Sequence, residues 1–340
     1  MSAMPIHERF VTEDQPVNEP QVVPLQDTYV MLRQLAGGVR TFLRSAQEEP
    51  CQQLGAPYSY SVWMRHLVST ARFGGLACPP KSVVELGPGS SLGTALAARL
   101  CGVQRYAAHE VVGRPEANRE LKVLVELIKM FMEREEIPGE EDYPRLRPKL
   151  TDYSYPASLI DERAAADPRL HETLSAAVAA IGAGEVSAGG ISFVNGRDGL
   201  QCTAACRSVD LLFSQAVMQY VDDLEDAYRE QLELLAPGGL ISHEIDFSAH
   251  ETASSWNGHW AISDLAWRAM RGAKPYFLNR HPFSRHVRAM RRAGFEMVAA
   301  LRSRVRNRLS RRQLAPRFRW LPEDDLNVRD ALIIARRPGT

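Results

Sequence analysis

The chain has 340 residues, of which 45% are hydrophobic and 24% charged, a composition typical of a soluble globular protein. Forty-one basic residues balance 41 acidic ones, so the overall charge gives no sign of a nucleic-acid or membrane partner. We find neither a membrane-spanning apolar stretch nor the apolar core of a signal peptide, and the five cysteines lack framework spacing. These features predict a cytoplasmic protein.

The N-terminal part of the chain divides into two predicted regions. Residues 1–26 are polar and interrupted by prolines, which predicts a flexible segment. Apolar residues then recur at helical spacing, and a helix over 58–76 is predicted to end at Gly74-Gly75. We expect residues 27–78 to form a helical cap that precedes the main domain, residues 79–340.

Strand and helix patterns alternate from residue 79 onwards. This alternation predicts an α/β fold with a parallel sheet, in which the last two strands form an antiparallel pair at one edge. The segment at about 113–189 is much longer than one crossover helix needs, which predicts an inserted helical cap. The predicted strands are 82–86, 105–112, 190–196, 209–217, 240–247, 295–303 and 330–338.

A glycine-rich turn joins the first of these strands to the next helix. The sequence VVELGPGSSLG places Gly87, Gly89 and Gly93 at a spacing one residue longer than the dinucleotide-binding fingerprint. Glu85 would repel a pyrophosphate but attract a ligand that carries a sulfonium and an ammonium group. Glu110, at the end of the second strand, could accept hydrogen bonds from two ribose hydroxyls, which fits NAD and an adenosyl ligand equally well.

Four motifs occur in a recognisable order: VVELGPGSSLG, an acidic end to the second strand, VDLLFSQAVMQYVDDL and LLAPGGLISHEIDF. Together they resemble the class I S-adenosylmethionine-dependent methyltransferase family, over roughly residues 80–247 and the final strands. The resemblance implies a Rossmann-like, seven-stranded, mostly parallel sheet with an antiparallel last strand, and S-adenosyl-L-methionine as cofactor. The family's cofactor positions correspond here to Glu85, Gly87, Gly89, Glu110, Asp198 (near the adenine), and Ser214 and Gln215 (at the methionine end).

The exit of the fifth predicted strand, residues 242–260, is rich in histidines and carboxylates. An oxygen or nitrogen acceptor must lose a proton, so a base near the methyl group is useful. In the family this strand end faces the substrate, which makes His243 the first candidate base and Asp246 or His250 the second. A histidine satisfied by hydrogen bonds is an equally favoured interpretation of His243. The three side chains could also bind a divalent metal, but their spacing has no fixed geometry, so we predict none.

Aromatic residues flank this region on both sides. They could line a substrate pocket, although packing of a cap over the sheet explains them at least as well. The candidates are Tyr58 and Tyr60 before the first strand and Trp256 and Trp260 after the fifth.

Residues 302–319 contain eight arginines and no acidic residue. Such a cluster could bind an anionic acceptor or RNA. We favour a solvated connector that faces the acidic sequence LPEDD at 321–325.

These features predict an enzyme that moves a methyl group from S-adenosylmethionine to an oxygen or nitrogen of a small molecule, such as a specialised metabolite or sugar. One alternative is a protein of this fold that binds the adenosyl ligand without catalysis. Another is an RNA methyltransferase that uses the arginines. Against the latter, SQAV stands where many amino-group nucleic-acid methyltransferases have D/N-P-P-Y/F. The sequence indicates neither the acceptor nor the oligomeric state.

Overall fold

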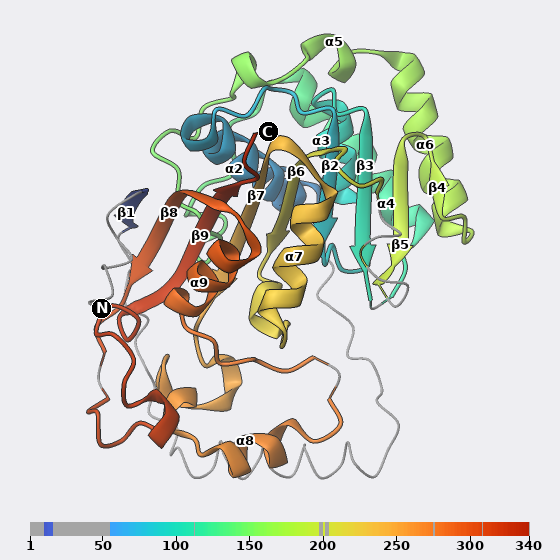
Figure 1. Ribbon diagram of the computed structural model, residues 1–340. Coiled ribbons are helices and arrows are strands. Elements are labelled where there is room, and N and C mark those ends of the chain that lie inside the picture. Colours follow the sequence, from blue (N-terminus) through green and yellow to red (C-terminus); the bar gives the residue numbers. More distant parts are fainter. Residues whose placement is uncertain are drawn as a thin grey trace.

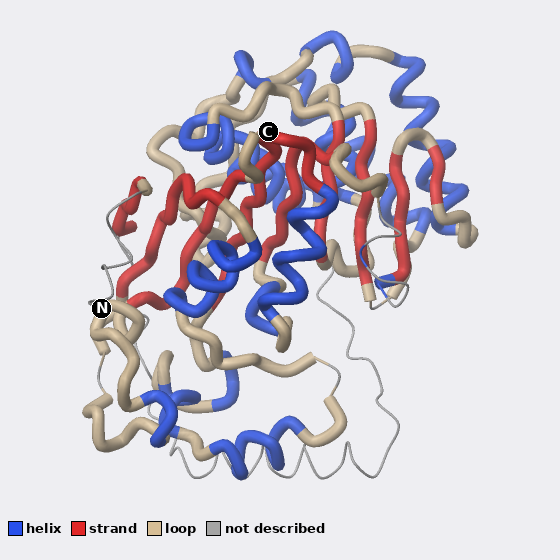
Figure 2. Tube along the Cα trace, in the orientation of Figure 1, coloured by secondary structure: helices blue, strands red, loops and turns tan. Residues whose placement is uncertain are grey.

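The computed structural model describes residues 10–15, 55–111, 113–196, 200, 204–274, 276–307 and 309–339. Within these ranges the strands form one nine-stranded sheet with helices on both faces (Figure 1, Figure 2). The strands are β1 (Val11–Gln15), β2 (Ser82–Leu86), β3 (Arg105–Glu110), β4 (Ser187–Ala188), β5 (Ile191–Asn195), β6 (Val209–Gln215), β7 (Leu235–Asp246), β8 (Glu296–Arg304) and β9 (Val328–Arg336).

The strand order is β1-β8-β9-β7-β6-β2-β3-β5-β4. Strand β9 is antiparallel to both of its neighbours, β4 is antiparallel to β5, and the other pairs are parallel. The run from β8 to β5 is therefore a mostly parallel, seven-stranded sheet with a reversed last strand. This arrangement confirms the predicted fold class.

The expected number of seven strands was too low, because one short strand is added at each edge of the sheet. Strand β1 lies within the segment predicted to be flexible, and it pairs with β8 from Val11 opposite Ala299 to Gln15 opposite Ser303. An ion pair of 2.8 Å between Asp14 and Arg302 reinforces this pairing. Residues 16–54, which include most of the predicted N-terminal cap, lie outside the described ranges.

Helices cover the two faces of the sheet in two groups. One group is α2 (Ala56–Gly74), α3 (Gly93–Leu100), α4 (Ala117–Met132) and α6 (Pro168–Gly182); the other is α7 (Leu224–Leu234) and α9 (Phe283–Ala293), in front of the sheet in Figure 1. Helix α2 has a proline in its first turn and ends at Gly75, whose φ of +57° suits glycine. Among the described helices, none is both long and apolar enough to cross a membrane.

The predicted insertion contains α4, α6 and the short α5 (Glu162–Ala165). A separate lobe, formed by residues 247–282 and 305–327 with α8 (Asp264–Arg271), lies beyond the carboxyl ends of the parallel strands (Figure 1). Its small core is built from apolar side chains of both segments: Trp260, Leu314, Ala315, Phe318 and Leu326.

The arginine-rich connector is extensively ion-paired. Arg302 and Arg304 both contact Asp324, and Arg311 contacts Glu323 at 3.0 Å. The structure confirms that these three arginines face the acidic segment, but Arg302 and Arg304 belong to β8 and Arg302 is buried, so they are not part of a solvated connector.

Candidate active site

The strand order reverses between β2 and β6, because the chain winds outward from β2 in one direction and from β6 in the other. In open α/β sheets, ligands bind in the crevice at the carboxyl ends of the strands on either side of such a reversal. At this edge the glycine loop follows β2, Glu110 ends β3, Gln215 ends β6 and Asp246 ends β7. The topology therefore brings the predicted cofactor loop and the predicted acceptor strand to one edge.

The glycine loop has a backbone that requires glycine. Gly87 and Gly89 have φ angles of +69° and +68°, a region that residues with a side chain rarely adopt. A Cβ on Gly87 would lie 2.5 Å from a methyl carbon of Val217, just after β6. A Cβ on Gly93 would lie 2.2 Å from Oγ of Ser59 in α2. The loop is thus pressed between the segment after β6 and the start of α2.

Glu110 lies directly against this loop. Its Oε2 accepts a hydrogen bond from the Gly89 N–H at 2.5 Å, and its Oε1 accepts one from the Val111 N–H at 2.7 Å. The predicted ribose-binding carboxylate and the predicted cofactor loop are therefore in contact. Asp198, the predicted adenine contact, lies outside the described residues.

Glu85 is a buried carboxyl, with 4% of its surface exposed. It accepts a hydrogen bond of 2.6 Å from the hydroxyl of Tyr106. Burial raises its pKa to about 8, so most of this carboxyl is protonated at neutral pH. The negative charge expected of Glu85 is thus largely absent in this structure.

His243 is not at the strand end, and its prediction as a substrate-facing base is wrong. The side chain is fully buried within β7. Its Nε2 donates to Oε1 of Gln231 in α7, and its Nδ1 accepts from Oγ of Ser214, each at 2.8 Å. Burial lowers its pKa to about 3, which keeps the ring neutral. The alternative interpretation, a histidine satisfied by hydrogen bonds, holds.

The hydroxyl of Ser214 is used in the hydrogen bond to His243. Its predicted place at the methionine end of the cofactor is therefore also contradicted. Its side chain is fully buried on the α7 face of the sheet. Strand alternation sends the neighbouring residue, Gln215, to the opposite face and to the edge.

Asp246 and His250 are brought together by the structure. Asp246 is the last residue of β7, and its Oδ2 lies 3.6 Å from Nε2 of His250. Both side chains are partly exposed, at 28% and 34%. The His250 ring also lies 6.2 Å from the Tyr220 ring, which follows β6. This pair lies at the carboxyl end of β7.

No metal site is assembled from the three candidates. His243 lies on the face of β7 opposite to Asp246 and is hydrogen-bonded to Ser214 and Gln231. Within the described part of the chain, no group of three or more His, Cys, Asp and Glu side chains is arranged to hold a metal ion.

Gln215 is the centre of a polar network on the α2 face that the sequence did not reveal. Its Oε1 accepts from Nε2 of His66 at 3.1 Å, and its Nε2 donates to Oε2 of Glu244 at 3.1 Å. His66 is fully buried, and burial lowers its pKa to about 4. With His66 neutral and its other nitrogen 2.8 Å from Oγ of Ser242, the amide of Gln215 is held in one orientation.

The same face carries a second pair that was missed. Asp330 in β9 lies 3.6 Å from Nε of Arg147, which comes from the insertion. Arg147 also donates to Oγ of Ser303 at 3.2 Å. Strand alternation puts Glu244 on the same face as Asp246, and this is the sequence signal that could have pointed to the cluster.

Two of the four aromatic candidates are core residues. Tyr60 and Trp260 are fully buried, which contradicts a role in lining an open pocket. Tyr60 donates to the Glu135 carbonyl at 2.9 Å, and Trp260 donates to the Arg280 carbonyl at 3.1 Å. Trp256, which is partly exposed, packs edge-on against Trp260. Tyr58 packs edge-on against Tyr143, with ring centroids 5.5 Å apart.

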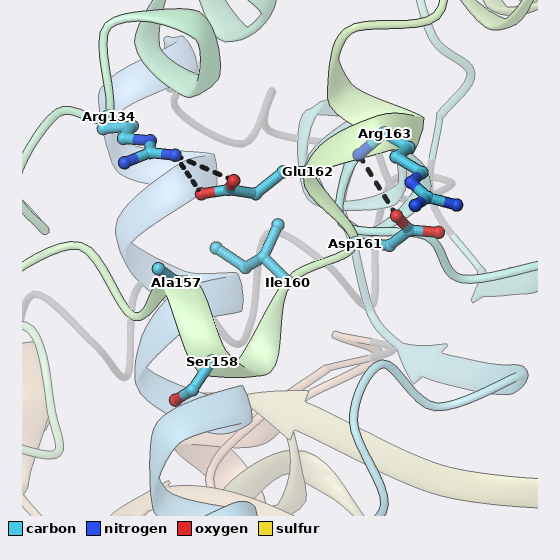
Figure 3. Close-up of a pocket in the computed structure, with 7 residues that line it drawn as sticks. All are labelled: Arg134, Ala157, Ser158, Ile160, Asp161, Glu162 and Arg163. Carbon is cyan, nitrogen blue, oxygen red and sulfur yellow. Dashed lines mark hydrogen bonds and ion pairs between the residues drawn. The ribbon is translucent and has the colours of Figure 1, made fainter.

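A cavity of about 580 Å³ lies away from this edge, between the end of α4 and the segment around α5 (Figure 3). Arg134 and Glu162 form an ion pair of 2.7 Å beside it, and Asp161 caps the N–H of Arg163. No predicted site residue lines this cavity. We do not assign a function to it.

No protein-family model and no curated protein matches the sequence. Solved structures that resemble it include an S-adenosylmethionine-dependent methyltransferase from Mesorhizobium loti, 15% identical over 77% of this chain and 93% of that chain, with a TM-score of 0.38. A geranyl diphosphate C-methyltransferase from Streptomyces coelicolor A3(2) is 14% identical over 99% and 94% of the two chains, with a TM-score of 0.40. A putative sarcosine dimethylglycine methyltransferase from Galdieria sulphuraria is 11% identical over 83% and 86%, with a TM-score of 0.41.

These similarities are too low to transfer an activity, and the fold assignment stands on the strand order. The run β8-β9-β7-β6-β2-β3-β5, with β9 reversed, carries the glycine loop after its central strand β2. The chain has the fold of the class I S-adenosylmethionine-dependent methyltransferases.

Proposed function

We propose that the protein is an S-adenosylmethionine-dependent methyltransferase that acts on an oxygen or nitrogen of a small molecule. The observation that carries this proposal is the contact between Glu110 and the N–H of Gly89 at the point where the strand order reverses. It joins a carboxylate suited to ribose hydroxyls with a loop that has two glycines of positive φ.

The residues at this edge fit such a cofactor. Gly89 would let the ligand approach the backbone, and Glu110 would accept hydrogen bonds from the ribose. Gly87 makes room for Val217, which packs against the loop. Glu85 would regain its charge beside a cation, and Gln215 stands at the end of β6 with its amide held by His66. When bound, the cofactor supplies a methyl group already activated by the sulfonium, so the protein has mainly to align the acceptor and exclude water.

The Asp246–His250 pair is the proposed proton acceptor. A carboxylate beside an imidazole orients the ring and stabilises the cation formed when the ring takes a proton. The nitrogen that faces Asp246 is Nε2, so Nδ1 of His250 is the atom that would take the acceptor's proton. His243 has no part in this step, because both of its ring nitrogens are already hydrogen-bonded inside the sheet.

Neither the RNA alternative nor an anionic acceptor gains support from the arginine-rich connector. Arg302, Arg304 and Arg311 are ion-paired with neighbouring carboxylates. Arg317 likewise lies 3.3 Å from Asp264. These four arginines therefore give no reason to add an anionic acceptor or RNA to the proposal.

A labelled-methyl assay tests the proposal. The protein is incubated with S-adenosylmethionine carrying a tritiated methyl group, together with a metabolite extract or, separately, with total RNA. We expect label in the small-molecule fraction and a strong decrease with His250→Asn. Label in the RNA instead would favour the RNA alternative. Cofactor binding without transfer to either fraction would favour a non-catalytic binding protein.

A further inference from the structure

Three carboxyl groups meet on one face at the carboxyl edge of the sheet. Asp246 at the end of β7 lies directly opposite Asp330 in β9. Glu244 stands two residues before Asp246, and residues i and i+2 of a strand share a face. Glu244 accepts a hydrogen bond from Gln215, which in turn accepts one from His66 in α2. All three carboxyls therefore belong to the face of the sheet that carries α2.

The positive charge beside this cluster is small. Among the described residues, Arg147 is the cation paired with it, and its Nε stands 3.6 Å from Oδ1 of Asp330. Arg329 precedes Asp330 in β9 and is directed to the other face by strand alternation, although its charge also favours the ionised form of Asp330. Burial and the neighbouring carboxyls raise the pKa of Glu244 well above its usual value. Burial also raises the pKa of Asp330 to about 6, so the cluster carries less negative charge near neutral pH than three ionised carboxylates would, and a cation beside it would favour the ionised forms.

Asp330 provides a second and independent sign of a ligand. The residue is 94% buried, since 6% of its surface is exposed, yet its Oδ1 makes no hydrogen bond. A buried acceptor left without a donor is costly, so such atoms are normally satisfied by the protein, by water or by a ligand. Glu244 accepts from Gln215, and Asp246 accepts from the Ser248 N–H, so Oδ1 of Asp330 is the acceptor of this cluster that lacks a donor. An ammonium group has N–H donors and one positive charge, so it could donate to that oxygen and offset the charge of the carboxyls around it.

The place of the cluster fits an acceptor. Glu244 is hydrogen-bonded to Gln215 at the end of β6, and Asp246 contacts His250, the proposed proton acceptor. We propose that Glu244, Asp246 and Asp330 form a subsite for a protonated amine of the methyl acceptor, so that the substrate class is an amine-bearing small molecule. That the bound amine belongs to a methyl acceptor rests on the proposed function. Binding of a cation to this subsite can be measured whether or not the protein transfers a methyl group.

Methylammonium is the smallest suitable probe, and methanol is its uncharged isostere. The protein is labelled with 13C at the side-chain carboxyl carbons of aspartate and glutamate, and the probes are added at constant ionic strength. The Asp330 and Glu244 signals are assigned by their loss in Asp330→Asn and Glu244→Gln. We expect methylammonium to shift both signals saturably, with a midpoint on the order of 10 mM, the range that two non-hydrogen atoms can supply. Methanol and potassium chloride should leave them in place.

The variants sharpen the test. The response of the remaining cluster signal should be lost in Asp330→Asn and, as a second variant should that one not fold, in Glu244→Gln. It should persist in Glu172→Gln, which removes an exposed carboxylate on α6. Equal responses to methylammonium and methanol, or an unchanged response in both cluster variants, would overturn the proposal. Calorimetry with S-adenosylhomocysteine, run in parallel, reports the proposed function separately, because it does not involve the amine.

Discussion

Glu110 and Gly89 are joined by a hydrogen bond of 2.5 Å between the carboxylate Oε2 and the backbone N–H. This bond ties the end of β3 to the loop after β2, two segments that a nucleoside ligand contacts together in sheets of this kind. It also means that Glu110 is held in place before any ligand arrives.

The first prediction concerns this carboxylate. Glu110→Ala should weaken the binding of S-adenosylhomocysteine by about 10- to 100-fold, because charge-assisted hydrogen bonds to the ribose hydroxyls are lost. Calorimetric titration measures the change in affinity. Glu172→Ala, on the exposed side of α6, is the matched control and should bind normally. An unchanged affinity in Glu110→Ala would show that Glu110 does not bind the ribose.

The second prediction concerns the backbone of the glycine loop. Gly87→Ala should lower the free energy of unfolding by about 2–4 kcal/mol, since it adds both an unfavourable φ and a clash with Val217. Gly238→Ala is the control: its φ is +79°, but no atom lies within 4 Å of the added Cβ, so the loss should be about 1–2 kcal/mol. Urea unfolding measures both. Equal losses would show that Val217 does not restrict the loop.

The third prediction distinguishes the roles of His243, within β7, and His250, which follows this strand. His250→Asn should lower kcat by about 10²- to 10⁴-fold, the usual contribution of a proton acceptor, with little change in cofactor affinity. His243→Gln should lower stability but leave kcat largely intact, because both ring nitrogens of His243 are hydrogen-bonded inside the sheet, to Ser214 and Gln231. Steady-state kinetics on the folded fraction distinguish these outcomes. A larger kcat loss in His243→Gln would reverse the assignment.

The fourth prediction follows from the lowered pKa of His243, about 3 in the folded protein against 6.5 as its ordinary value. Between these values the unfolded chain binds a proton that the folded chain excludes, so stability is lost as the pH falls below about 6.5. The stability advantage of wild type over His243→Gln should shrink by about 2 kcal/mol from pH 7 to pH 5. Denaturant unfolding at both pH values measures this difference. An advantage that is independent of pH would mean that the folded ring titrates as in water.

The fold was largely predictable because its signals are local. Alternating strand and helix patterns and the Gly-Pro-Gly turn are written in short stretches of the chain, and the structure confirms the sheet that they predict. The edge strands β1 and β4 were missed, because they are only five and two residues long and carry no periodic pattern of their own. Strand β1 is defined by its pairing with β8, which lies at the other end of the sequence.

The site was only partly predictable, for two physical reasons. His243 was misplaced because its face of β7 is covered by α7, where Gln231 binds its ring, and the strand pattern does not tell which face a helix covers. Asp330 and Arg147 were missed because their contact joins β9 to the insertion, and no sequence pattern reports such a pairing. Alternation alone did place Glu244 and Asp246 on one face.

The most direct test of the central claim is calorimetric titration of the wild-type protein with S-adenosylmethionine and, separately, with NADH. The account predicts saturable binding of S-adenosylmethionine, weakened by Glu110→Ala, and no binding of NADH. Binding of NADH, or of neither ligand, would contradict it and would leave the glycine loop as a turn without the proposed cofactor.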